Sequence, residues 1–149
     1  MPKHLLGSSL VAAVVVGAVA AGGLAVASSG TGPAVRNATV RYAAPSAGGP
    51  GSVTFTAEVR DDSGVRGLKA VAWPARSELD PTEAEMRYVD DATCRPTTDV
   101  TSRCTYTLKV TKEEAARLDK GTWYVSALAT AEDGGTAFVP RAAVFDLTR

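Results

Sequence analysis

Acidic residues gather in two segments that have the composition of tight turns. Asp61 and Asp62 precede Ser63, and Glu132 and Asp133 precede a pair of glycines. Calcium in proteins takes roughly six to eight oxygen ligands, many of them carboxylates on loops. If the two turns lie at the same end of the fold, these four carboxylates could share a calcium ion, the only cofactor that the sequence suggests. The alternative is that they are ordinary turn residues that cap their own backbone.

The remaining acidic pairs are Glu83 with Glu85 and Asp90 with Asp91. Glycosidases need only two carboxylates, but these must flank the scissile bond at a defined separation. Residues that are adjacent in sequence do not establish that separation, and a short domain leaves little room for a sugar cleft. We therefore expect solvated carboxylates and no catalytic residue, with a small carboxylate-based hydrolase as an alternative.

Histidine occurs once, as His4, close to the N-terminus. A Ser-His-Asp or Cys-His arrangement needs an imidazole to take the proton of the nucleophile near neutral pH. Zinc sites built from histidine and free cysteine need the same side chain. If the segment that carries His4 is removed on export, both kinds of site are excluded.

That segment, residues 1–27, has the composition of a cleavable secretory signal peptide. Lys3 and His4 form a positive start, residues 5–27 carry no charge, and Ala25-Val26-Ala27 is a small-x-small cleavage site. We expect cleavage after Ala27 and a flexible leader over residues 28–33, which are mostly Ser, Gly and Thr. The alternative is an uncleaved anchor, because about 20 apolar residues can span a bilayer.

The mature chain is close to electrically neutral. Cleavage removes Lys3 from the 16 Lys and Arg, leaving 15 against 16 Asp and Glu. Nucleic acids and anionic membranes require a basic surface, so we expect neither as a partner.

Two cysteines, Cys94 and Cys104, remain after cleavage. Disulfides persist outside the cell, so we expect these two to be bonded, with free buried thiols as the alternative. Closing a loop of about ten residues stabilises a fold by roughly 2.5 to 3 kcal/mol in the chain-entropy model. The polar segment 95–103 would then be a tethered loop. It could recognise a protein partner or simply connect two strands.

Four aromatic residues, Trp73, Tyr106, Trp123 and Tyr124, could form a platform on which sugars stack. The alternative is that they belong to the core, where the central Trp of an immunoglobulin-like sandwich lies.

Alternation of apolar and polar residues predicts strands along most of the chain. The clearest is Ser52–Arg60, in which Val53, Phe55 and alternate residues beyond share one face. The other expected strands are 34–43, 65–73 ended by Pro74, a strand containing Cys94, and 103–110, 122–131 and 136–147. Pro140 should place the last of these at an edge or a bulge, and Asp133-Gly134-Gly135 should form its hairpin turn.

Helical signals are fewer. Thr111 and Glu114 have the spacing of a capping box, so a short helix should run to about Leu118. The segment 75–89 is ambiguous: Asp80 could cap a helical turn that begins at Pro81, or residues 85–89 could form a strand.

About seven short strands and one short helix, separated by turn residues, predict a mainly β fold. We expect residues 34–149 to form an immunoglobulin-like antiparallel β-sandwich, with a small barrel as the alternative.

Several stretches together resemble a family of small secreted actinobacterial proteins that is catalogued only as a domain of unknown function. They are VTFTAEVRDDSGVRGLKAVAWP (53–74), LDPTEAEM (79–86), Cys94 with residues 104–110, and GTWYVSALATAEDG (121–134). The resemblance implies export and a β-sandwich, and it supplies no activity, ligand or site residue.

The expected function follows from these observations. We expect a secreted, non-enzymatic binding or interaction module whose partner is a protein or a carbohydrate outside the cell. The alternatives are a structural protein of the cell envelope and the small hydrolase considered above.

Overall fold

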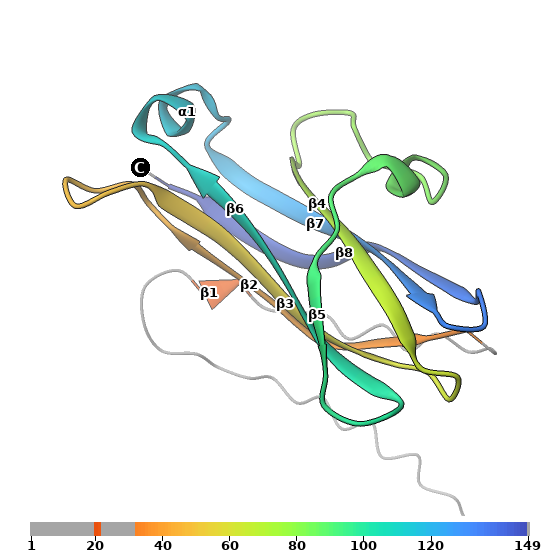
Figure 1. The fold of residues 1–149 in the computed structure, drawn as a ribbon. Coiled ribbons are helices and arrows are strands. Elements are labelled where there is room, and N and C mark those ends of the chain that lie inside the picture. The colour runs from red at the N-terminus through yellow and green to blue at the C-terminus, as the bar shows by residue number, and fades with distance from the viewer. Residues whose placement is uncertain (1–19, 22–31, 149) are drawn as a thin grey trace, which may run out of the picture.

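The computed structural model describes residues 20–21 and 32–148, and these fold into two packed antiparallel sheets (Figure 1). The strands are β1 (Ala20–Ala21), β2 (Ala34–Ala43), β3 (Gly51–Arg60), β4 (Val65–Pro74), β5 (Thr93–Pro96), β6 (Thr101–Val110), β7 (Gly121–Ala131) and β8 (Thr136–Leu147). A 3₁₀ helix, η1 (Glu85–Tyr88), and an α-helix, α1 (Lys112–Arg117), complete the fold.

The strand order confirms the expected sandwich in place of a barrel. One sheet has the order β1-β2-β3-β6-β5 and the other the order β4-β7-β8. Without β1, these orders correspond to strands A-B-E-D and C-F-G of constant-type immunoglobulin domains.

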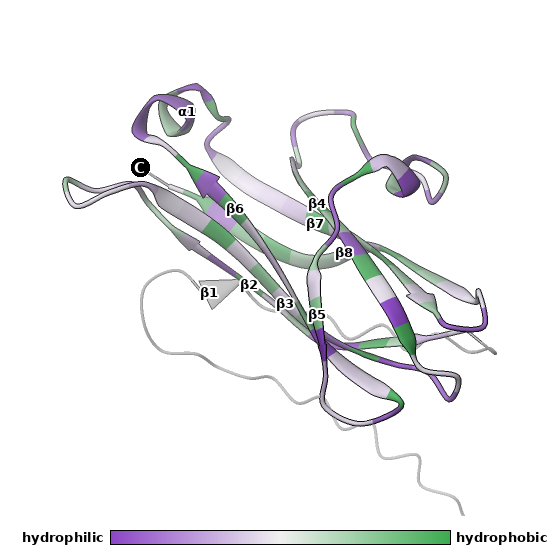
Figure 2. Ribbon diagram, in the orientation of Figure 1, coloured by the Kyte–Doolittle hydropathy of each residue, from purple (hydrophilic) through white to green (hydrophobic). Residues whose placement is uncertain are grey.

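The core lies between the sheets because each strand alternates in burial. Along β3, Phe55, Ala57 and Val59 are buried, and Thr56 and Glu58 between them are partly exposed. From the facing sheet, Val125, Ala127 and Phe145 enter the same core. The alternation of hydrophobic and hydrophilic residues is visible along the strands in Figure 2.

The ambiguous segment between β4 and β5 covers the outer face of the smaller sheet. It contains η1, which contacts β4 and β7 and buries Met86 completely. The alternative of a strand over residues 85–89 is therefore wrong. The helix begins at Glu85 and not at Pro81, and Thr82, not Asp80, bonds to its first residue. The Thr82 hydroxyl oxygen accepts from the Glu85 N–H (3.3 Å), and the Glu85 carboxylate accepts from the Thr82 N–H (2.8 Å).

The predicted capping box is confirmed at α1. The Thr111 hydroxyl oxygen accepts from the Glu114 N–H (3.1 Å), and the Glu114 carboxylate accepts from the Thr111 N–H (2.8 Å). Both bonds satisfy backbone donors that a helix start leaves free. The helix carries the chain from β6 in one sheet to β7 in the other (Figure 1).

The last hairpin also follows its sequence signals. Gly134, with a φ of 90°, forms the turn between β7 and β8. The register between these strands shifts between Val125 and Ala127, opposite the segment of β8 that contains Pro140. Pro140 lacks an N–H, so its place at this irregularity in an edge strand agrees with the prediction.

Much of the N-terminal region lies outside the described residues. The predicted signal peptide (1–27) is described only at Ala20–Ala21, which pair with β2, and the predicted leader (28–33) only at its last two residues. Among the described helices, none is long and apolar enough to cross a membrane.

Candidate functional site

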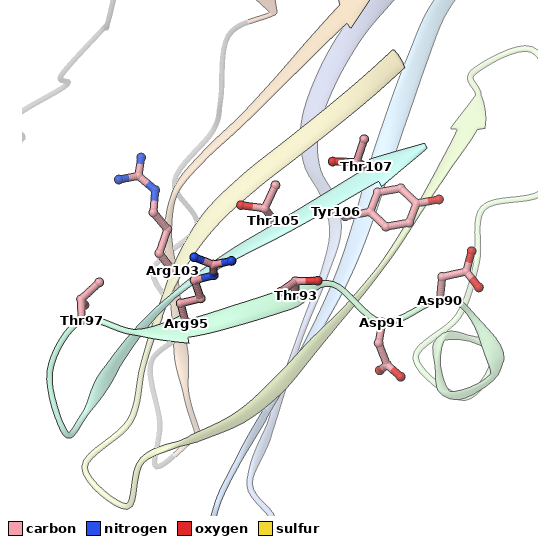
Figure 3. A pocket seen from close by; sticks show the side chains of 9 residues that line it. All are labelled: Asp90, Asp91, Thr93, Arg95, Thr97, Arg103, Thr105, Tyr106 and Thr107. Carbon is pink, nitrogen blue, oxygen red and sulfur yellow. The ribbon is translucent and has the colours of Figure 1, made fainter. Parts of the chain in front are cut away.

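A groove of about 900 Å³ opens along the outer side of the β5–β6 hairpin (Figure 3). Its floor comes from alternate residues of the two strands, and its far end comes from Asp90 and Asp91, just before β5. Its lining consists of Asp90, Asp91, Thr93, Arg95, Thr97, Arg103, Thr105, Tyr106 and Thr107.

The hairpin holds these side chains at fixed positions. Cys94 and Cys104 are direct register partners with Cα atoms 4.0 Å apart, and they form a disulfide, as predicted. Their side chains point toward the core, so the residues on either side of them point outward into the groove. Thr93 therefore faces Thr105, and Arg95 faces Arg103, on the outer face.

The position of the groove depends on where the chain crosses from the smaller sheet to β5 in the larger sheet. Just before β5, the segment 90–92 runs along the edge of β4 in the other sheet. The Ala70 N–H donates to the Asp90 carbonyl (3.1 Å), and the Ala92 N–H donates to the Leu68 carbonyl (2.8 Å). This crossing leaves the second half of β6 without β5 beside it, and the hollow forms there.

A row of threonines crosses the same sheet face. Thr39, Thr56, Thr105 and Thr93 are successive register partners on β2, β3, β6 and β5. Neighbouring strands lie about 4.8 Å apart, so the row presents hydroxyl groups at that spacing. Each hydroxyl can donate and accept hydrogen bonds. The groove therefore opens onto a sheet face that carries a row of hydroxyl groups.

Charge is divided between the two ends of the groove. Arg95 and Arg103 lie at one end, and Asp90 lies at the other with the hydroxyl of Tyr106 pointing toward it (Figure 3). Burial raises the pKa of Tyr106, and the negative charge of Asp90 raises it further. Asp91 is already engaged, because its carboxylate lies 2.9 Å from the Lys69 ammonium. The groove therefore offers two cations, one unengaged carboxylate and several hydroxyls.

The residues predicted as calcium ligands lie in two turns that do come together. The Glu132 N–H donates to the Gly64 carbonyl (3.0 Å), and the Asp133 N–H donates to the Ser63 hydroxyl oxygen (3.1 Å). The expected clustering of these turns at one end of the sandwich is visible in Figure 1.

The carboxylates in these turns have protein partners. Asp61 accepts hydrogen bonds from the hydroxyl (2.6 Å) and the N–H (2.9 Å) of Ser63, and these bonds lower the pKa of Asp61. Asp62 lies 3.8 Å from Arg60, and Glu132 lies 3.9 Å from Arg66. The Asp133 carboxylate accepts from the Gly135 N–H (2.8 Å).

Three or more potential metal ligands do not come together anywhere in residues 20–21 and 32–148. Calcium binding by Asp61, Asp62, Glu132 and Asp133 stays a prediction. Thermal unfolding with added calcium and then with a chelator tests it, because a ligand of the folded state alone raises the melting temperature.

Most of the proposed aromatic platform is buried. Trp73 is 2% exposed, Trp123 and Tyr106 are each 7% exposed, and the Trp73 ring lies 5.1 Å from that of Tyr124. Tyr124 is itself covered by the guanidinium of Arg141, 4.5 Å from the ring centroid. These aromatics therefore form packing contacts, as the core interpretation predicts, and not a platform for sugars.

The tethered loop predicted between the cysteines is shorter than expected. β5 continues to Pro96 and β6 begins at Thr101, so only residues 97–100 form the turn. The Thr97 and Thr98 N–H groups both donate to the Thr101 carbonyl. The disulfide therefore braces a tight hairpin and does not frame a long recognition loop.

The other acidic pairs are dispersed. The Glu83 carboxylate accepts from the Thr136 hydroxyl (3.1 Å), and Glu85 caps its own helical turn. Of these acidic residues, only Asp90 and Asp91 line the groove.

Sequence reasoning missed the pair formed by Arg95 and Arg103. The signal was present, because each arginine is adjacent to a cysteine on the inner side of the disulfide-closed segment. Once the cysteines are register partners, the arginines must be the next partners along the hairpin.

Comparison with known proteins adds one match. The model of a protein family described as a family of unknown function (DUF5707) matches residues 35–129, which include β3 to β6 and most of β2 and β7. No curated protein and no solved structure matches the chain.

Proposed function

We propose that this chain, which belongs to the family of unknown function DUF5707, is a secreted, non-enzymatic binding module whose binding face is the groove on β5 and β6. One observation carries the proposal. The groove presents Arg95 and Arg103 as direct register partners, and the guanidinium of neither has an ion-pair or hydrogen-bond partner within the part of the chain that the structure describes. Charged side chains left without internal partners at a concave surface are available to a ligand.

Two features support secretion. Residues 1–27 have the charge pattern and the small-x-small site of a signal peptide. The disulfide between Cys94 and Cys104 supports the same location, because such bonds persist in oxidising compartments. The intact mass of the exported product tests this: we expect a chain that begins at Ser28, and a product that retains residues 1–27 contradicts it.

The non-enzymatic role is supported by the chemistry of the groove. Without residues 1–27 the chain has no histidine to act as a general base. The two carboxylates in the groove are neighbours in sequence, and Asp91 is paired with Lys69. Two carboxylates that flank a glycosidic bond face each other across it, which this arrangement does not provide.

A variant that fills the groove tests the proposed binding face. Thr105 lies in the floor of the groove, so we expect Thr105→Trp to block ligand entry. Thr39→Trp is the matched control, because Thr39 lies in the same threonine row but on β2, outside the groove.

Binding would be measured by calorimetry of the exported protein with soluble polysaccharides, both neutral (dextran) and acidic (polygalacturonate). We expect at least one of them to bind the wild type and Thr39→Trp but not Thr105→Trp. Equal binding by Thr105→Trp, or no binding by any of the three proteins, contradicts the proposal.

A further inference from the structure

Arg95 and Arg103 form a pair of like charges that the fold itself does not neutralise. They are register partners on adjacent antiparallel strands, and both side chains are exposed on the same face. Figure 3 shows them rising from the same side of the hairpin. Like charges directly opposite each other destabilise a sheet. Departures from such local rules are expected where a residue serves function and not stability.

Two carboxylates close to this pair in register or along the groove form no ion pair with it. Glu58 is the register partner of Arg103 on β3, but its carboxylate accepts a hydrogen bond from the Asn37 side chain (2.8 Å). Asp91, at the far end of the groove, is paired with Lys69. The two guanidinium groups therefore remain available to an external anion.

The rest of the lining indicates what carries that anion. None of the nine residues that line the groove is aliphatic, and four of them are threonines. Protein interfaces instead have an apolar core that is enriched in aromatic residues. Threonine hydroxyls, together with the carboxylate of Asp90, suit a ligand that is itself rich in hydroxyl groups.

We propose that the groove binds an acidic polysaccharide. This inference rests on the proposed function above and names its ligand class. Arg95 and Arg103 hold one anionic group of the sugar chain, a carboxylate or a sulfate, because a guanidinium donates two parallel hydrogen bonds to a pair of oxygen atoms. Thr93 and Thr105 bond to sugar hydroxyls beside it, and Asp90 accepts from hydroxyls at the far end of the groove.

The hairpin is suited to this role because it is rigid. The Cys94–Cys104 disulfide lies one residue from each arginine and fixes the register of the two strands. A site held in its binding geometry before the ligand arrives loses less conformational entropy on binding.

The test compares binding of the exported protein to polygalacturonate, dextran sulfate, neutral dextran and polyglutamate at low ionic strength. We expect the first two, which carry carboxylate and sulfate groups respectively, to bind about tenfold or more tightly than dextran or polyglutamate, the scale of one charge-assisted hydrogen bond. The affinities for polygalacturonate and dextran sulfate, compared with each other, show whether the site prefers a carboxylate or a sulfate.

The double variant Arg95→Gln/Arg103→Gln should lose about tenfold or more of this affinity. The matched control is Arg76→Gln/Arg87→Gln, which has the same net charge but lies in the segment that covers the opposite sheet. It should bind as the wild type does. The melting temperature of Arg95→Gln/Arg103→Gln at low salt should be unchanged or higher, which separates lost binding from lost folding.

Any other outcome contradicts a specific part of the two proposals. If dextran binds as well as the acidic polymers and Thr105→Trp blocks it, the proposed function stands and the acidic ligand is wrong. If both double variants lose affinity equally, net charge and not the arginine pair is responsible. If polyglutamate binds as tightly as polygalacturonate, the groove recognises negative charge and not sugar hydroxyls, and the polysaccharide assignment is wrong. If no polymer binds, both proposals fail.

Discussion

Arg95 and Arg103 lie directly opposite each other on β5 and β6, each adjacent to a cysteine of the Cys94–Cys104 disulfide. Neither forms an ion pair with any residue that the structure describes. A hairpin is stable without this arrangement, and like charges at directly opposite positions destabilise it. The pair is therefore the feature of this fold that most directly requires a functional explanation, and anion binding is the one we propose.

Replacing one arginine should stabilise the protein at low salt. We expect Arg95→Gln to raise the free energy of unfolding by about 0.2 to 1 kcal/mol, because it removes the like-charge contact with Arg103 and Arg95 has no other cross-strand partner on its edge strand. The gain should vanish at about 1 M salt, where the Debye length is only about 3 Å. Urea unfolding at both salt concentrations measures it, with the exposed Arg76→Gln as control. A loss of stability at low salt would show that Arg95 has a stabilising partner.

Removing the disulfide should weaken the whole domain. The bond closes a segment with a sequence separation of 10 residues. In the chain-entropy model its loss lowers the free energy of unfolding by roughly 2.5 to 3 kcal/mol. Urea unfolding of Cys94→Ala/Cys104→Ala measures this loss, and a reducing agent should not affect this variant further. An unchanged unfolding midpoint after reduction of the wild type contradicts the prediction.

Tyr42 should be replaceable with a gain in stability. Its hydroxyl is buried and has no hydrogen-bond partner, while its ring packs 6.3 Å from that of Phe145. A buried polar group without a partner costs about 1 to 3 kcal/mol, so Tyr42→Phe should raise the free energy of unfolding by about 1 kcal/mol. Tyr88→Phe, at a side chain that is 91% exposed, should leave stability unchanged. Destabilisation by Tyr42→Phe would show that the hydroxyl is satisfied.

The hydrogen bonds of Ser126 should contribute strongly to the smaller sheet. The Trp73 indole N–H donates to the Ser126 hydroxyl (2.8 Å), which donates in turn to the Pro140 carbonyl (2.6 Å). Ser126→Ala leaves the buried indole N–H without an acceptor, so we expect a loss of about 1 to 3 kcal/mol in the free energy of unfolding.

A double-mutant cycle separates this bond from packing. In a Trp73→Phe background the indole donor is already absent, so Ser126→Ala should cost less than it does in the wild type. Equal costs in the two backgrounds would mean that the Trp73–Ser126 hydrogen bond does not contribute.

Stability should fall in acid, partly through Asp61. Hydrogen bonds from the Ser63 hydroxyl and then its N–H lower the pKa of this carboxyl from an ordinary value of 3.8. A carboxyl with a lowered folded-state pKa contributes stability above its unfolded-state pKa, and this stability is lost as the pH falls through the folded-state pKa. Chemical unfolding at a series of pH values should show the loss beginning near pH 4.

The variant Asp61→Asn should lose less stability over this pH range than the wild type, because its side chain does not titrate. The exposed Asp62→Asn, one residue away, is the control and should keep the wild-type dependence. Identical pH profiles for Asp61→Asn and the wild type would contradict the role of Asp61.

Local signals explain why the strands were predictable. The bounds of β2 and β8 agree with the expected 34–43 and 136–147, because period-two alternation and turn residues are both properties of neighbouring residues. The capping box at α1 and the irregular position of Pro140 are local in the same sense. At these positions the sequence expresses the rule within a few residues, and the structure agrees with the prediction.

The segment between β4 and β5 and the groove depend on contacts between distant residues. Met86 is buried because η1 folds over β4 and β7, which no local pattern around residue 86 specifies. The groove exists because residues 90–92, just before β5, pair with β4 in the other sheet and do not extend β5 along β6. The sequence candidates, the acidic turns and the aromatics, were chosen by residue type, whereas the proposed site depends on the strand register, which places the two arginines together.

The most direct test of the binding face is amide chemical-shift mapping by NMR. The exported, isotope-labelled protein would be titrated with galacturonate oligosaccharides at low salt. We predict that the largest shifts lie in residues 93–97 and 103–107, on the two strands of the groove. Shifts concentrated in the acidic turns at 61–64 and 132–135, or spread evenly over the surface, would contradict the account.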